Sequence, residues 1–131
     1  MILHLAIPAN NIVESIEFYL KLDAILGRKT PSWVVFNFFN SQLVLHKNKN
    51  FDERPSMYPR HFGVILDEEK FNYYYDLSKR QNLKFFEECF ERYSGEFAEH
   101  KTFFLCDPSN NTIEFKWYRQ TSSIFGEKIS Q

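Results

Sequence analysis

Two histidines and one glutamate, His4, His61 and Glu114, occupy similar places in three separate segments of the chain. Each segment alternates apolar and less apolar residues, which is the pattern of a half-buried β-strand, and each of the three residues lies on the less apolar side. Neutral imidazole and carboxylate suit borderline divalent metals. Three such side chains on separate strands can therefore converge on one metal ion. The segments are residues 2–7, 61–66 and 112–117.

A site with two histidines and one carboxylate leaves coordination positions open, and the metal decides the chemistry. With Fe(II), such a facial triad binds a bidentate oxygen substrate together with O₂, whereas Zn polarises an oxygen atom or activates water. Taken singly, a histidine on a strand is more often a hydrogen-bonded structural residue, and a glutamate on a strand is more often solvated. The repeated placement of the three residues favours a metal site over these structural roles.

These segments belong to a chain that repeats one order of secondary-structure elements. Asn10 or Asn11 can cap the first predicted helix, and Asp67 can cap the second. The sequence therefore predicts an internal duplication of two βαβββ units. The first unit has a strand, a helix and three strands at 2–7, 11–21, 24–30, 33–39 and 42–46, with a tight turn at Asn40-Ser41. After a polar stretch at 47–59, the second has a strand at 61–66, a helix to about Arg80, and strands at 84–90, 102–106 and 112–117.

The alignment of the two units shows where they differ in chemistry. Superposing their last strands pairs Val44 with Glu114 and His46 with Lys116. The first unit therefore has no carboxylate at the position where the second unit has Glu114.

Composition excludes several classes of function. The chain has 131 residues, a size that fits one domain, and a net charge of -1 without a basic stripe, which does not indicate nucleic-acid binding. There is no apolar run long enough to span a membrane and no secretory signal pattern at the N-terminus. The two cysteines lack metal or redox spacing. We expect a soluble, cytoplasmic protein with a phenylalanine-rich core.

The local motifs resemble those of the vicinal oxygen chelate superfamily, which includes glyoxalase I, bleomycin-resistance proteins, fosfomycin-resistance enzymes and extradiol dioxygenases. The resemblance covers residues 2 to 118. Each motif is weak alone, but their order and spacing are fairly specific. They are His4-Leu5-Ala6-Ile7 before a helix that ends in Phe18-Tyr19, His61-Phe62-Gly63-Val64 before the second helix, and Asp107-Pro108-Ser109-Asn110-Asn111 before Ile113-Glu114-Phe115.

This resemblance implies an α+β fold in which two βαβββ modules form a curled mixed sheet around a cleft. The expected domain covers residues 1–120, followed by a polar tail at 121–131. Within it, the first module covers about 1–48, the linker about 49–59 and the second module about 60–118. The family also implies a homodimer.

The resemblance assigns metal-ligand roles to His4, His61 and Glu114. The fourth family position, an acid in glyoxalase I, is Val44 here, which argues against a four-ligand site. The implied cofactor is a divalent metal, with Fe(II) favoured and Zn, Mn or Ni as alternatives. His46, two residues beyond Val44 on the same face, is a candidate acid–base or supporting group near the metal, or a substitute ligand if the strand register slips, and His100 is expected to face solvent. Candidates for the substrate cleft are Phe36, Phe38, Phe104 and Lys116.

The resulting hypothesis is a metal-dependent enzyme that acts on a small oxygenated substrate, with dioxygenase-like chemistry favoured by the three-ligand set. A binding protein of the bleomycin-resistance kind is the main alternative, because the same fold can sequester a ligand without catalysis. Glyoxalase-like or thiol-transferase-like activity is a third possibility. No nucleic-acid or membrane partner is expected.

Overall fold

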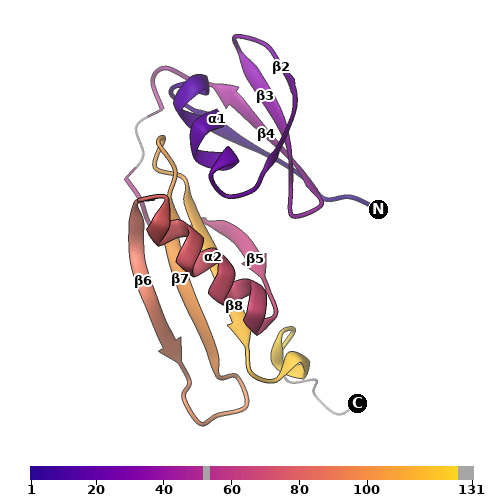
Figure 1. Cartoon of the computed structure of the whole chain (residues 1–131), viewed down its shortest axis with the longest axis vertical. Helices are drawn as coiled ribbons and strands as arrows, with labels where there is room; N and C mark the ends of the chain where they lie inside the picture. The colour runs from indigo at the N-terminus through magenta and orange to yellow at the C-terminus, as the bar shows by residue number, and fades with distance from the viewer. Residues whose placement is uncertain (52–53, 127–131) are drawn as a thin grey trace.

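The computed structural model describes residues 1–51 and 54–126, and these form two βαβββ modules (Figure 1). The predicted duplication is therefore confirmed. The first module comprises β1 (His4–Ala9), α1 (Ile12–Leu20), β2 (Ile25–Lys29), β3 (Trp33–Phe38) and β4 (Ser41–Lys47). The second comprises β5 (Phe62–Ile65), α2 (Glu68–Arg80), β6 (Phe85–Arg92), β7 (His100–Cys106) and β8 (Thr112–Tyr118). In the predicted tail, Thr121–Ser123 form a short 3-10 helix, η1, and residues 127–131 lie outside the described part.

Each module folds into one four-stranded mixed sheet. The strand orders are β1-β4-β3-β2 and β5-β8-β7-β6, and in both sheets the first strand of the module runs parallel to the last. Ala6 pairs with Val44 in the first sheet, and Gly63 pairs with Glu114 in the second. This register confirms the alignment of Val44 with Glu114.

The helices begin where the capping residues predict. The side chain of Asn11 accepts a hydrogen bond from the backbone of Glu14 at 3.0 Å, and that of Asp67 accepts one from Lys70 at 2.8 Å. These contacts satisfy backbone N–H groups that have no partner within the helix. Among the described residues, no helix is both long and apolar enough to cross a membrane.

The first hairpin turns one residue earlier than predicted. Phe39 and Asn40 have φ values of 51° and 59°, and Ser41 already belongs to β4. Two successive residues with positive φ form the kind of turn that matches the twist of a tight hairpin. The sequence Asn40-Ser41 suggests a turn more strongly than Phe39-Asn40 does, which explains the error.

The core lies between each sheet and its helix. Phe36 and Phe38, predicted to line a cleft, are 0% and 6% exposed, and both rings pack on Tyr19 of α1. That prediction is corrected by the alternation of β3, which turns Trp33 and Val35 to the opposite face. We call the face of each sheet opposite its helix the open face.

A buried polar network joins the two modules. Tyr19 of α1 donates its hydroxyl to the Asp107 carboxylate at 2.8 Å, and Asn111 donates to the carbonyl of Pro8 at 2.9 Å. The backbone N–H of Asn10 donates to the hydroxyl of Ser109 at 2.8 Å. Burial raises the pKa of Asp107, although its hydrogen bonds oppose the shift. The hairpin that precedes β8 is therefore fixed against the first module.

Gly63→Ala is expected to destabilise the fold. A Cβ atom on Gly63 would lie 1.8 Å from the backbone oxygen of Glu114, which cannot move without disturbing the β5–β8 pairing. We expect a loss of about 1–3 kcal/mol in the free energy of unfolding, measured by denaturant titration. Gly27→Ala is the matched control, because its Cβ would lie 3.1 Å from the Val35 oxygen. Equal stability of the two variants would contradict the close approach at Gly63.

The pair of Glu99 and Arg119 is expected to make stability depend on pH. Hydrogen bonds from the Arg119 guanidinium and then from the Gly95 backbone lower the pKa of Glu99. A lowered carboxyl pKa gives stability that is present above the unfolded value, near 4.5, and is lost as the pH falls through the folded value. Glu99→Gln should be less stable at neutral pH and should lose less stability on acidification.

The effect of Glu99→Gln should be modest, because the Arg119 side chain is 56% exposed and solvent screens the pair. The measurement is denaturant unfolding at a series of pH values on both sides of 4.5. Parallel curves for the wild type and the variant would contradict this account.

Candidate functional site

Glu114 lies at the centre of the open face of the second sheet, and its carboxylate is held on both sides. One oxygen, Oε1, lies 2.9 Å from Nε2 of His61, and the other, Oε2, accepts the hydroxyl hydrogen of Thr102 at 2.6 Å. Glu114 is only 8% exposed and Thr102 is fully buried. A carboxylate with one oxygen fixed and the other facing an imidazole is oriented in the way that a metal ligand requires.

The imidazole of His61 is held between two acceptors. Its Nδ1 lies 2.5 Å from the carbonyl oxygen of Met57, and its Nε2 faces Glu114. The Met57 carbonyl can only accept, so the first contact needs a hydrogen on Nδ1, whereas the second needs one hydrogen between Nε2 and the Glu114 oxygen. The Met57 carbonyl fixes the hydrogen on Nδ1, so Nε2 is the atom left to bind a cation in place of its own hydrogen.

His4 lies on the open face of the first sheet, on β1. Its Nδ1 is 2.7 Å from the side-chain oxygen of Gln42, its neighbour on β4, and the residue is exposed. This contact also leaves Nε2 as the free ring nitrogen. Within residues 1–51 and 54–126, however, no group of three His, Cys, Asp or Glu side chains is close enough to hold a metal. The structure brings His61 and Glu114 together but does not bring His4 to them in one chain.

His46 shares the open face of the first sheet with His4, at the other end of the strand pair. It is exposed, lies opposite Pro8 on β1 and opposite Trp33 on β3. On this face of β4, Val44 lies between His46 and Gln42, the residue that pairs with His4. The first sheet therefore has Val44, and not a carboxylate, in the row where the second sheet carries Glu114. The acid–base role of His46 stays a prediction.

Aromatic rings surround the pair of His61 and Glu114 on one side. Phe104, a predicted cleft residue, meets the His61 ring edge to face at 5.5 Å. Phe86 and Phe90 of the edge strand β6 pack on Phe104 with centroid distances of 6.2 and 6.5 Å. Sequence reasoning did not select these two residues, because β6 has irregular register against β7 and simple alternation does not assign its faces.

His100 is buried, which corrects the expectation that it faces solvent. It is 6% exposed, its Nδ1 lies 2.9 Å from the carbonyl oxygen of Ala98, and its ring is 4.7 Å from that of Tyr118. The reason is that β7 begins at His100, earlier than predicted, and pairs there with Arg92 and Tyr118.

Lys116, two residues beyond Glu114 on the same face, holds its ammonium 5.1 Å from the Tyr118 ring.

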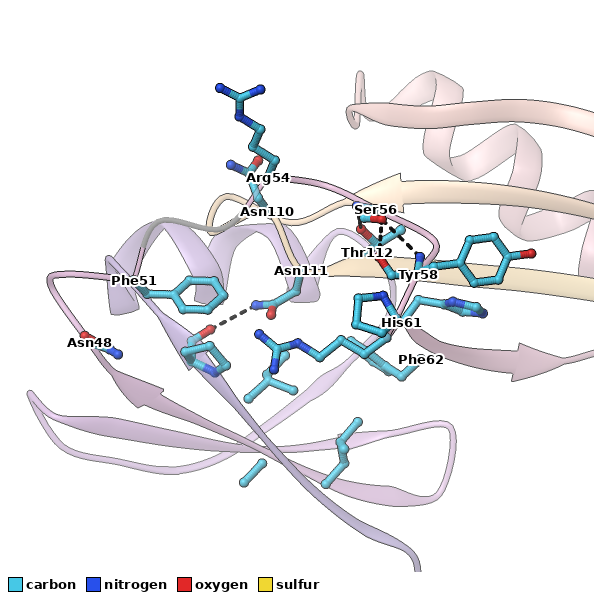
Figure 2. A pocket seen from close by; sticks show the side chains of 16 residues that line it. Asn48, Phe51, Arg54, Ser56, Tyr58, His61, Phe62, Asn110, Asn111 and Thr112 are labelled. Atoms are coloured by element: carbon cyan, nitrogen blue, oxygen red, sulfur yellow. Dashed lines mark hydrogen bonds between the residues drawn. The ribbon is translucent and has the colours of Figure 1, made fainter.

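A cavity of about 630 Å³ lies between β1 and the segment that leads into β5, and His61 forms part of its wall (Figure 2). Ser56 ties this segment to β8 by donating its backbone N–H to the Thr112 hydroxyl at 3.0 Å. The volume is in the range of small-molecule sites. Other lining residues include Pro8, Phe51, Tyr58, Asn110 and Asn111.

Two comparisons with known proteins point to one family. The model of the Glyoxalase/Bleomycin resistance protein/Dioxygenase superfamily matches residues 1–115. A search of the curated proteins finds no match. Among solved structures, a glyoxalase/bleomycin resistance protein/dioxygenase from Alicyclobacillus acidocaldarius is 41% identical, with a TM-score of 0.89 over 95% of this chain and 96% of that chain.

More distant structures share the fold. The fosfomycin resistance protein FosX from Listeria monocytogenes is 14% identical, with a TM-score of 0.69 over 89% of this chain and 90% of that chain. Lactoylglutathione lyase from Agrobacterium tumefaciens is 13% identical, with a TM-score of 0.66 over 89% and 92%. By the match of the family model to most of its length, this chain belongs to the glyoxalase/bleomycin resistance protein/dioxygenase superfamily.

Proposed function

We propose that the protein is a metal-dependent enzyme that binds a small oxygenated substrate through His61, Glu114 and His4. One observation carries the proposal: each candidate ligand already has its non-ligating atom held by a neighbour. Met57 holds His61 and Thr102 holds Glu114, as Gln42 holds His4. Such contacts orient metal ligands and fix the histidine tautomer.

Two copies of the chain complete the ligand set in this proposal. The second module supplies His61 and Glu114, whereas the first module supplies His4 but has Val44 in the place of an acid. Because His4 is exposed on an open sheet face, it can enter the site of a second copy. A homodimer with this arrangement has two equivalent sites, and each site takes ligands from both chains.

The metal would supply a Lewis acid that binds vicinal oxygens of the substrate and, as Fe(II), also binds O₂. We favour Fe(II) and a dioxygenase-like reaction, because two imidazoles and one carboxylate leave open the positions that both reactants need. The chain's own residues hold the ligands in place, and Phe104, with Phe86 and Phe90 behind it, keeps water from one side of the pair. Zn, Mn or Ni are the alternatives to test.

Mixed dimers test the shared site. We expect His4→Ala and Glu114→Ala chains to lose metal when expressed alone, since each lacks a ligand in every site. Co-expressed with different affinity tags and purified as mixed dimers, they should regain metal in the one site that keeps all three ligands. Metal analysis gives the stoichiometry, and oxygen uptake with catechols after anaerobic Fe(II) loading gives the activity.

The matched control co-expresses His61→Ala with Glu114→Ala, which removes ligands from the same module in both chains, so no mixed dimer has a complete site. Recovery of metal in this control, or its absence in the first pair, would rule out the shared site. Metal binding without oxygen uptake would remove the dioxygenase assignment. A wild-type protein that takes up no metal would favour the non-catalytic binding protein.

Thr102→Val should weaken metal binding while leaving the fold intact. The change removes the hydroxyl that orients Glu114 at 2.6 Å but keeps the shape of the side chain. Loss of such a supporting contact typically lowers metal affinity about 10- to 100-fold. Metal affinity is measured by competition with a chromophoric chelator. Thr102→Ser keeps the hydroxyl and should retain the affinity, so equal affinities of the two variants would contradict the role of Thr102.

A further inference from the structure

We infer that Thr112 is a positioning residue for His61 and that it acts through the loop of residues 56–60. The inference rests on the proposed function, because it concerns the orientation of a proposed metal ligand. It adds a residue that sets the direction of the His61 imidazole by way of the backbone of this loop.

Thr112 lies beside His61 at the start of the parallel pairing between β5 and β8. Phe62 is opposite Ile113 in this pairing, and the residues immediately before that pair are His61 and Thr112. Alternation along β8 puts Thr112 on the same face as Glu114. Thr112 is only 5% exposed, and a buried hydroxyl needs a hydrogen-bond partner within the protein.

The partner of this hydroxyl comes from the loop. The backbone N–H of Ser56 donates to the Thr112 hydroxyl oxygen at 3.0 Å. Within the described residues, this is the only hydrogen bond that joins residues 56–58 to β8. Thr112 therefore fixes the position of the loop relative to the strand that carries Glu114.

Local hydrogen bonds hold the next part of the loop in one conformation. The hydroxyl of Ser56 accepts the backbone N–H of Tyr58 at 3.0 Å and donates to the Tyr58 carbonyl oxygen. Figure 2 shows Ser56 joined to both Thr112 and Tyr58. A serine hydroxyl that bonds to the backbone two residues on is a common way to stabilise a turn. Met57 lies inside this turn, so the direction of its carbonyl follows from the position of Ser56.

The Met57 carbonyl in turn sets the direction of His61. Its oxygen lies 2.5 Å from Nδ1 and can only accept, so this contact puts a hydrogen on Nδ1 and turns Nε2 toward Glu114. Strand β8 therefore orients the imidazole twice, directly through Glu114 and indirectly through Thr112. If the loop shifts, the Nδ1 hydrogen loses its acceptor and Nε2 is no longer held in the direction of the metal.

Thr112→Val tests this path, because valine keeps the shape of threonine and removes the acceptor for Ser56. In the metal-free protein, we expect the Nδ1 hydrogen of His61 to exchange with water about five- to tenfold faster, measured by NMR on protein with labelled histidine. Zn affinity, measured by competition with a chelator, should fall about tenfold. Thr112→Ser keeps the hydroxyl and should restore both values.

Thr30→Val is the matched control. The Thr30 hydroxyl also accepts backbone N–H groups, those of Ser32 and Trp33 at 3.1 and 3.2 Å, but in the turn between β2 and β3 of the first module. Its loss should leave the exchange of the His61 hydrogen and the Zn affinity unchanged. Denaturant titration of both variants separates a local change at His61 from a general loss of stability.

Ser56→Ala is a second variant on the same path. It keeps the N–H that Thr112 binds but removes the hydroxyl that braces Met57, so exchange of the His61 hydrogen should again be faster. The inference is overturned if exchange is unchanged in both Thr112→Val and Ser56→Ala, or if Thr112→Ser behaves like Thr112→Val.

The two measurements also separate this inference from the proposed function. A wild-type protein that binds no Zn or other divalent metal, but in which Thr112→Val speeds the exchange, would support the role of Thr112 and reject the metal enzyme. Metal binding that is the same in the wild type and Thr112→Val, with unchanged exchange, would reject the role of Thr112 alone.

Discussion

The parallel pairing of the first and last strands of a module is the constraint on which the site depends. It brings residues far apart in the sequence into adjacent rows of one sheet, so that His61, just before β5, meets Glu114 in the middle of β8. The close approach at Gly63 fixes this pairing, because the backbone of β8 occupies the place of a side chain. The same pairing in the first module puts Val44, an apolar residue, opposite Ala6. The duplicated fold therefore yields two modules with unequal chemistry.

Much of the fold could be predicted from the sequence because its signals are local. Alternation gave the strands, Asn11 and Asp67 gave the starts of the helices, and the turn residues before Thr112 gave the last hairpin. The register of the duplication followed from the placement of the histidines. Errors occurred where local signals compete, as at the turn of Phe39 and Asn40, or where pairing with a neighbour extends a strand, as at His100.

The site was less accessible to sequence reasoning. The residue types made His61 and Glu114 candidates, and the structure brings the two together, but their supporting contacts depend on the loop that carries Met57 and on the strand that carries Thr102. The alternation of β3 gave no means to tell its two faces apart, since both are rich in apolar residues, so Phe36 and Phe38 were assigned to the wrong side. The irregular pairing of the edge strand β6 also meant that alternation could not assign Phe86 and Phe90 to a face of the sheet. Whether the three candidate ligands meet within one chain depends on how the two modules pack together, and no local sequence pattern predicts that packing.

The buried contacts among Tyr19, Asp107 and Asn111 limit which segments of this protein can be exchanged with those of a relative. They join α1 of one module to the hairpin from which β8 emerges in the other. A chimera that exchanged only the second module with a relative would separate Tyr19 and Pro8 from their hydrogen-bonding partners and displace the start of the strand that carries Glu114. A chimera therefore has to exchange the segment that carries Pro8 and Tyr19 together with the hairpin that carries Asp107 and Asn111.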